Sequence, residues 1–209
     1  GNATNASASD YTPLQWTNSN NTYAVGYYVG PYTITRKNVT LAPVDKVYDG
    51  TSNASFGSSA IIVGDNVTVN YSNGNFYSNV TANTTTKNVG TWSVTASNLS
   101  ISGPDAFNYQ VTGSNASGTA NITARPLTIT SNASGGKVYG TSDYSSNANI
   151  ATAYAGSAYN ATANTGLVAG DTLTGNMTRV AGENVGSYNF TQGGVTVSDG
   201  NSGGNYNIT

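Results

Sequence analysis

Side chains able to carry acid–base, nucleophilic or metal chemistry are scarce in this 209-residue chain. It has no histidine and no cysteine, and Glu183 is its one glutamate. Triads built on histidine and metal sites built on histidine or cysteine are therefore impossible. A two-carboxylate hydrolase would have to use aspartates. Five aspartates, however, stand beside glycine or proline in turn-like contexts, at Asp49, Asp65, Asp105, Asp171 and Asp199.

We therefore expect no enzymatic activity and no cofactor. Calcium remains an alternative, because aspartate and asparagine oxygens at a joint between modules could bind it. The chain nevertheless has no Asp-x-Asp-x-Asp run of the kind that calcium loops use.

The chemistry that the sequence offers most often is N-linked glycosylation at Asn-x-Ser/Thr. The pattern occurs 17 times, more than twice as often as random placement of its residues would give. In eight cases the middle residue is apolar, so a strand with one inward residue between two outward ones could produce the same spelling. Asparagine is a poor strand former, and its repeated use therefore favours glycans. The predicted acceptors are Asn2, Asn5, Asn20, Asn38, Asn53, Asn66, Asn70, Asn79, Asn83, Asn98, Asn115, Asn121, Asn132, Asn160, Asn176, Asn189 and Asn207.

The charge balance excludes several classes of partner. Charged residues make up 8% of the chain and the net charge is −2, so the surface has no field for nucleic acid or anionic lipid. The longest aliphatic run, residues 60–63, is too short to cross a bilayer. No signal peptide is visible, which fits a matured secreted chain or a piece of a longer one. We expect an extracellular or cell-surface protein with no nucleic-acid partner and no membrane insertion.

The elements that must carry these residues are predicted to be β-strands. Apolar residues alternate with threonine, serine and asparagine in short runs, for example at residues 67–71 and 92–96. Glycine, asparagine and aspartate clusters separate the runs and are typical of tight turns. Several short strands per 90 residues favour an all-β fold of two tandem immunoglobulin-like β-sandwiches.

Three motifs occur twice and in the same order. KVYDGT at residues 46–51 returns as KVYGT at 137–141, KNVGTW at 87–92 returns as ENVGSY at 183–188, and NYQVT at 108–112 returns as NYNIT at 205–209. The offsets of 91, 96 and 97 residues have the size of a small domain. We predict an N-terminal extension (residues 1–37), a first module (38–124) and a second module (125–209), with Arg125 at the joint.

These motifs, together with GPDAFNY at residues 103–109 and GDTLTG at 170–175, resemble the YDG and MBG repeats. Such repeats are immunoglobulin-like modules of large secreted bacterial adhesins and surface proteins. The resemblance covers roughly residues 38–209. It implies β-sandwiches, an extracellular structural or adhesive role, and no catalytic residues.

The second module is predicted to lack its last strand. The first module continues past residues 108–112 into a strand at 118–123, whereas the second module reaches residues 205–209 without a counterpart. Residues 31–41 align with 119–130, so the extension contains a candidate replacement. Donation of this strand to a neighbouring copy would build a head-to-tail, pilus-like filament. The candidate interface residues are Tyr23, Val25, Tyr27, Val29, Tyr32 and Ile34 on the donor and Tyr206 and Ile208 on the acceptor.

Two alternatives stay open at this point. The chain could be a window of a longer repeat array, in which the neighbouring strand belongs to the same polypeptide. It would then be a stalk or adhesive segment of a large surface adhesin. A face of exposed aromatics that binds host or surface glycans is a further alternative, with Trp16, Tyr27, Tyr28 and Trp92 as its candidates.

Overall fold

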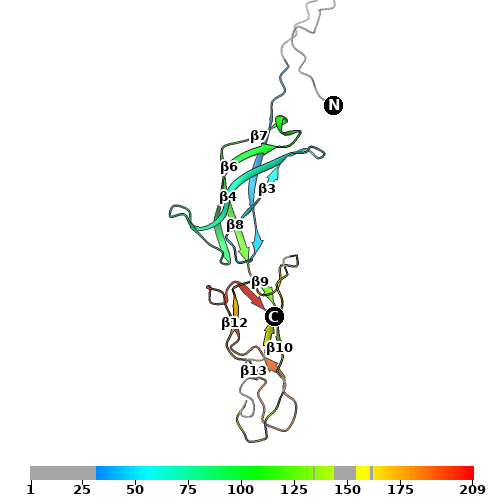
Figure 1. Cartoon of the computed structure of the whole chain (residues 1–209), viewed down its shortest axis with the longest axis vertical. Helices are drawn as coiled ribbons and strands as arrows, with labels where there is room; N and C mark the ends of the chain where they lie inside the picture. The colour runs from blue at the N-terminus through cyan, green and yellow to red at the C-terminus, as the bar shows by residue number, and fades with distance from the viewer. Residues whose placement is uncertain (1–31, 134, 144–153, 161) are drawn as a thin grey trace, which may run out of the picture. The chain divides into compact units, whose positions relative to one another are not determined.

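A computed structural model describes residues 32–133, 135–143, 154–160 and 162–209. These residues form two β domains, as the duplicated motifs predict, and their only helical element is the single 3-10 turn η1 (Ala106–Asn108) (Figure 1). Lys37–Thr209 forms one compact unit. None of the described residues belongs to a helix that could cross a membrane.

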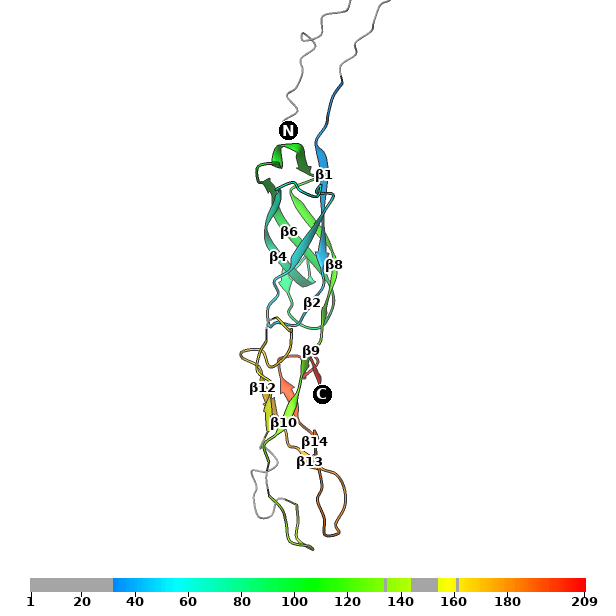
Figure 2. The ribbon, with the colours of Figure 1, turned by 90° about the vertical axis from the view of Figure 1, so that its right-hand side faces the viewer.

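The first module contains a five-stranded sheet in the order β2-β8-β6-β4-β5. Its long strands β4 and β6 pair antiparallel, β8 pairs antiparallel with the other edge of β6, and β2 adds to β8 in parallel (Figure 2). Alternation of threonine, serine and asparagine with valine, alanine and aromatic residues gives these strands one inward and one outward face. The strands are β2 (Lys46–Val47), β4 (Thr68–Asn79), β5 (Thr84–Thr85), β6 (Gly90–Ser102) and β8 (Asn115–Thr123).

A second, three-stranded sheet of the first module has the order β3-β1-β7. Its strands are β1 (Lys37–Val44), β3 (Ser55–Ser59) and β7 (Tyr109–Val111). The central strand β1 changes partner along its length. Its first three residues pair in parallel with β7, and its last five pair antiparallel with β3.

The second module is built from four two-stranded pairs among the described residues. They are β9–β16, β10–β11, β12–β15 and β13–β14, and β9–β16 is the parallel one. Their bounds are β9 (Arg125–Leu127), β10 (Ile129–Ser131), β11 (Tyr154–Gly156), β12 (Thr172–Thr174), β13 (Thr178–Arg179), β14 (Phe190–Thr191), β15 (Thr196–Ser198) and β16 (Tyr206–Ile208). These strands are much shorter than β4 and β6 of the first module.

The buried core is continuous across both modules. In the first module it contains Tyr48, Phe76, Val94 and Ile122, and in the second it contains Leu127, Val168, Val197 and Tyr206. Full burial of one such apolar side chain stabilises a fold by about 1.5–3 kcal/mol. Because residues of both modules share one cluster, each module contributes to the stability of the other.

Candidate assembly site

The structure repeats the same strand pairing in both modules. Lys37 at the start of β1 is aligned with Tyr109 in β7, and Arg125 at the start of β9 is aligned with Tyr206 in β16. Both pairings are parallel, so β9 is the counterpart of β1 at an offset of 88 residues. The antiparallel pairs β12–β15 and β13–β14 likewise correspond to the two ends of the β4–β6 pair.

Strand β8 completes the sheet of the first module. It lies between β6 and β2, where Ile122 is aligned with both Gly90 and Lys46. Its inward residues Ala116, Ala120 and Ile122 are buried. Over residues 93–97 of β6, therefore, one edge pairs with β4 and the other with β8.

The counterpart of β8 is absent from the described part of the second module. Residues 137–138 correspond to β2 and residues 186–190 to the first part of β6, but residues 137–138 and 186–189 are in no strand. A surface cavity of about 340 Å³ opens between these two segments, with Lys137, Gly186, Tyr188 and Phe190 in its wall. We call it the open groove. It lies between the counterparts of β2 and β6, the two strands that flank β8 in the first module.

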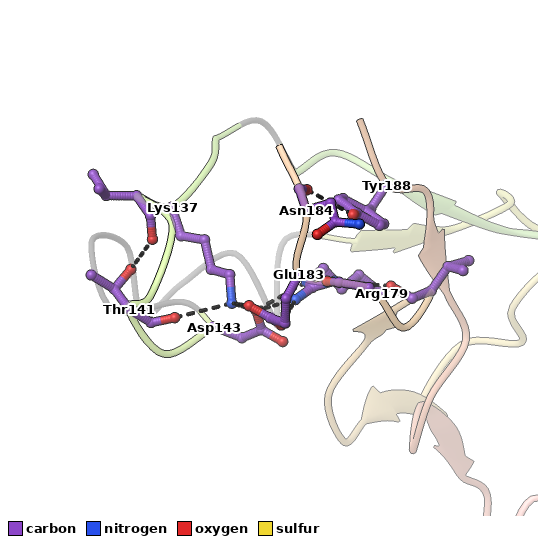
Figure 3. A network of polar contacts seen from close by, with 10 residues as sticks. Lys137, Thr141, Asp143, Arg179, Glu183, Asn184 and Tyr188 are labelled. Atoms are coloured by element: carbon purple, nitrogen blue, oxygen red, sulfur yellow. Dashed lines mark hydrogen bonds and ion pairs between the residues drawn. The ribbon is translucent and has the colours of Figure 1, made fainter. Parts of the chain in front are cut away.

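Four charged side chains form a network at the rim of the open groove (Figure 3). Arg179 bonds Asp143 at 2.9 Å and Glu183 at 2.6 Å, and Lys137 contacts both carboxylates. Hydrogen bonds from Lys137 and Arg179 hold the pKa of Glu183 below its usual value, and those from Arg179 and Lys137 do the same for Asp143. Such exposed pairs contribute little stability. They connect the segment of Lys137 and Asp143 with the segment of Arg179 and Glu183.

A buried polar joint connects the two modules. The hydroxyl groups of Tyr48 and Tyr206 both donate to Oδ2 of Asp171, at 3.0 and 2.6 Å. The two rings meet edge to face with centroids 5.4 Å apart. Burial and the hydrogen bond to Asp171 raise the pKa of both phenols well above 10. Tyr206 also accepts a hydrogen bond from the Val168 amide, so its hydroxyl is fully engaged.

An asparagine and an arginine complete this joint. Asn205 is fully buried; its Oδ1 accepts from the amide of Val89, and its Nδ2 donates to Asn88. Arg125 is 1% exposed and donates to the carbonyls of Tyr48, Asn160, Thr165 and Gly166. It also lies over the ring of Tyr159. The guanidinium charge is thus solvated by four peptide dipoles, an arrangement that compensates for its burial.

The predicted donor and acceptor residues fall in different surroundings. Tyr23, Val25, Tyr27 and Val29 lie outside the described residues, as do Trp16 and Tyr28. Tyr32 is 92% exposed and Ile34 is 76% exposed, in a segment without regular structure. Tyr206 is buried in the joint, and Ile208 is half-buried in the β9–β16 pair of its own module. Among the described residues, segments 137–138 and 186–189, which border the open groove, have no strand partner.

The predicted glycan acceptors lie mainly on the surface. Asn2, Asn5 and Asn20 fall outside the described residues. The other acceptors are exposed except for Asn121, which is half-buried in β8 and bonds Asp45 through its Nδ2. In the Asn-x-Ser/Thr sites whose middle residue is apolar, most of these middle residues point inward, as strand alternation predicts. Val80 is different, because it is exposed and lies in a turn. Alternation therefore does not explain the pattern at Asn79.

Sequence reasoning assigned Asp171 and Asp199 to turns and did not anticipate their burial. Asp171 is the acceptor of the joint. Asp199 accepts from the amides of Asn201, Gly203 and Asn205. Burial alone would raise the pKa of Asp199, but these backbone hydrogen bonds lower it. The sequence signal for the role of Asp171 was that a Gly-Asp pair (residues 64–65 and 170–171) and an Asn-Tyr pair (108–109 and 205–206) occur in both modules. Trp92, a candidate for sugar binding, is half-buried and donates to the Asn88 carbonyl.

Comparison with known proteins agrees with this internal repeat. A YDG domain model matches residues 30–118, and a model of the MBG domain of the YGX type matches residues 127–209. Both are non-catalytic repeat domains, and no catalytic family matches. No curated protein and no solved structure matches the chain. The chain therefore contains a YDG domain followed by an MBG domain (YGX type), domain types that are typical of large bacterial surface proteins.

Proposed function

We propose that this protein is an extracellular structural subunit that joins copies of itself head to tail by β-strand donation. Both modules are immunoglobulin-like sandwiches, and the second is completed only when a strand enters its open groove. The observation that carries the proposal is that no described residue takes the place of β8 between residues 137–138 and 186–190. Backbone without a strand partner beside a surface cavity can pair with a strand from another chain.

The register of β1 and β9 supports residues 31–35 as the donor. At the offset of 88 residues, residues 31–35 correspond to 119–123 of β8, so Tyr32 takes the place of Ala120 and Ile34 that of Ile122. Both counterparts face the core, whereas Tyr32 and Ile34 are exposed in the single chain. Burying them in a neighbour's groove removes this apolar surface from water. The same register aligns Tyr27 and Val29 with the solvent-facing Asn115 and Ser117.

A substitution in the donor tests this proposal on the full chain. Ile34→Asp places a charge where an inward residue is required and should leave the protein monomeric. Thr35→Asp is the matched control, because its counterpart Thr123 is exposed. Sedimentation velocity and negative-stain microscopy would read out assembly. Equal assembly of Ile34→Asp and wild type would refute donation by this segment.

A second candidate function is a stalk segment of one long surface polypeptide. It is favoured by the domain types, which are typical of large surface proteins. The strand in the open groove would then come from the same polypeptide. A denaturing gel of native material separates the two functions, because a fibre dissociates into short chains and a stalk stays one long chain.

We also propose that the exposed Asn-x-Ser/Thr sites carry N-linked glycans, which keep this weakly charged surface soluble. Asn121 should be the least occupied, since its side-chain nitrogen is bonded to Asp45 in a half-buried position. Glycopeptide mass spectrometry tests the ranking against Asn189, which is exposed and in no strand. An intact mass equal to the bare 21.3 kDa would refute glycosylation.

A further inference from the structure

The residues of the internal joint have counterparts of the same type at the two outer ends of the repeat. Asp171, Asn205 and Tyr206 of the second module correspond to Asp65, Asn108 and Tyr109 of the first. Tyr48, Asn88 and Val89 of the first module correspond to Tyr139, Asn184 and Val185 of the second. One set of three we call the head (Asp65, Asn108, Tyr109), and the other the tail (Tyr139, Asn184, Val185).

The head already has two of the hydrogen bonds of the joint. Tyr109 donates to Oδ2 of Asp65 and accepts from the amide of Ile62, as Tyr206 does with Asp171 and Val168. The head is more exposed than its counterparts in the internal joint. Asp65 is half-buried and Asn108 is exposed, whereas Asp171 and Asn205 are buried. Ile62 is 56% exposed, although its counterpart Val168 is buried.

The tail shows the complementary difference. Tyr139 is 70% exposed, whereas Tyr48 is completely buried against the second module. Val185 is 94% exposed, whereas Val89 is half-buried and its amide donates to Asn205. Large apolar side chains gathered on one exposed surface mark a place where another surface binds.

We propose that the tail of one copy binds the head of the next with the contacts of the internal joint. The Tyr139 hydroxyl donates to Asp65, beside Tyr109, as Tyr48 donates to Asp171. The Val185 amide donates to the side-chain oxygen of Asn108. Lys37 takes the position of Arg125 as the cation at the start of the first strand. This inference rests on the proposed head-to-tail assembly and adds the contacts of the head, which lie beside the donated strand because the three tail residues also line the open groove.

The chain connectivity supports the two contacts together. In the internal joint, β8 completes the first module and leads through Ala124 into β9 of the second (Figure 2). The proposed donor, residues 31–35, likewise leads directly into β1. A copy that donates its strand therefore brings its own head to the tail of the copy that accepts it. Linked contacts of this kind reinforce one another, because the second becomes intramolecular once the first has formed.

Substitutions in the tail of the full-length protein test the inference. Tyr139→Phe removes one hydroxyl that is exposed in the single chain, so the monomer should fold unchanged. Loss of a hydrogen bond to a carboxylate should weaken assembly about tenfold or more. The matched control is Tyr154→Phe, which removes a hydroxyl bonded to Gly175 within the second module. The measurement is the concentration at which wild type and variants assemble, by light scattering and sedimentation.

A pairwise cycle identifies the partner of Tyr139. If its hydroxyl reaches Asp65, adding Tyr139→Phe to Asp65→Asn should weaken assembly less than Tyr139→Phe does in the wild type. The proposed joint would be overturned if Tyr139→Phe did not change the assembly concentration, or if the effects of Tyr139→Phe and Asp65→Asn on it simply multiplied. Either result would leave strand donation intact. A wild type that stays monomeric at every concentration would overturn both proposals.

Discussion

Removing the carboxylate of Asp171 is the sharpest test of the internal joint. Asp171→Ala leaves the hydroxyls of Tyr48 and Tyr206 without their shared acceptor in a buried site. A hydrogen bond to a charged group contributes about 1.5–3 kcal/mol, so two of them give about 3–6 kcal/mol. For a chain of this size that corresponds to a fall in melting temperature on the order of 10 °C.

The duplication supplies a matched control for this substitution. Asp65 is the counterpart of Asp171 in the first module, but in a single chain it accepts one tyrosine hydroxyl, from Tyr109. It is also less buried. Asp65→Ala should therefore cost about half as much, or less, when both variants are measured at concentrations too low for assembly.

Thermal unfolding followed by circular dichroism would measure both variants. Near-ultraviolet spectra would additionally report the packing of Tyr48 and Tyr206. An Asp171→Ala variant that melts within about 2 °C of Asp65→Ala would refute the reasoning, because it would mean that the second hydroxyl contributes nothing.

Two further predictions concern the same joint. The raised pKa values of Tyr48 and Tyr206 mean that their contribution to stability is complete below about pH 10, the unfolded pKa of tyrosine, and is lost as the pH rises above it. The melting temperature should accordingly fall above pH 10, and less steeply in Tyr48→Phe; equal slopes would contradict the assignment. Gly166→Ala should cost about 2 kcal/mol or more in denaturant unfolding, because Gly166 has φ +84° and an added Cβ would overlap the Ala158 carbonyl. Gly170→Ala is its control, since Gly170 has a similar φ but open space around it, and equal losses would exclude the overlap as the cause.

Local patterns predicted the all-β class and the duplication. Alternation at residues 92–96 predicted a strand inside β6, and the recurrence of KVY and NY predicted two modules. These features could be predicted because side-chain alternation and motif spacing are properties of the chain itself. The immunoglobulin-like topology and the glycans remain predictions.

The pairing partners could not be predicted in the same way. The β16 strand is aligned with β9 of its own module, whereas the described segments without a strand partner at the open groove are residues 137–138 and 186–189. Strand register depends on contacts between distant residues, which alternation within one segment does not encode.

By itself, then, the sequence determined that the chain is a tandem of two β modules with few charges and many Asn-x-Ser/Thr sites. The tertiary structure alone decided that Asp171 joins those modules and that the open groove lies beside Lys137. The physical reason is that a turn aspartate and a buried one look the same in sequence. Only the packing of Tyr48 and Tyr206 around the carboxylate distinguishes them.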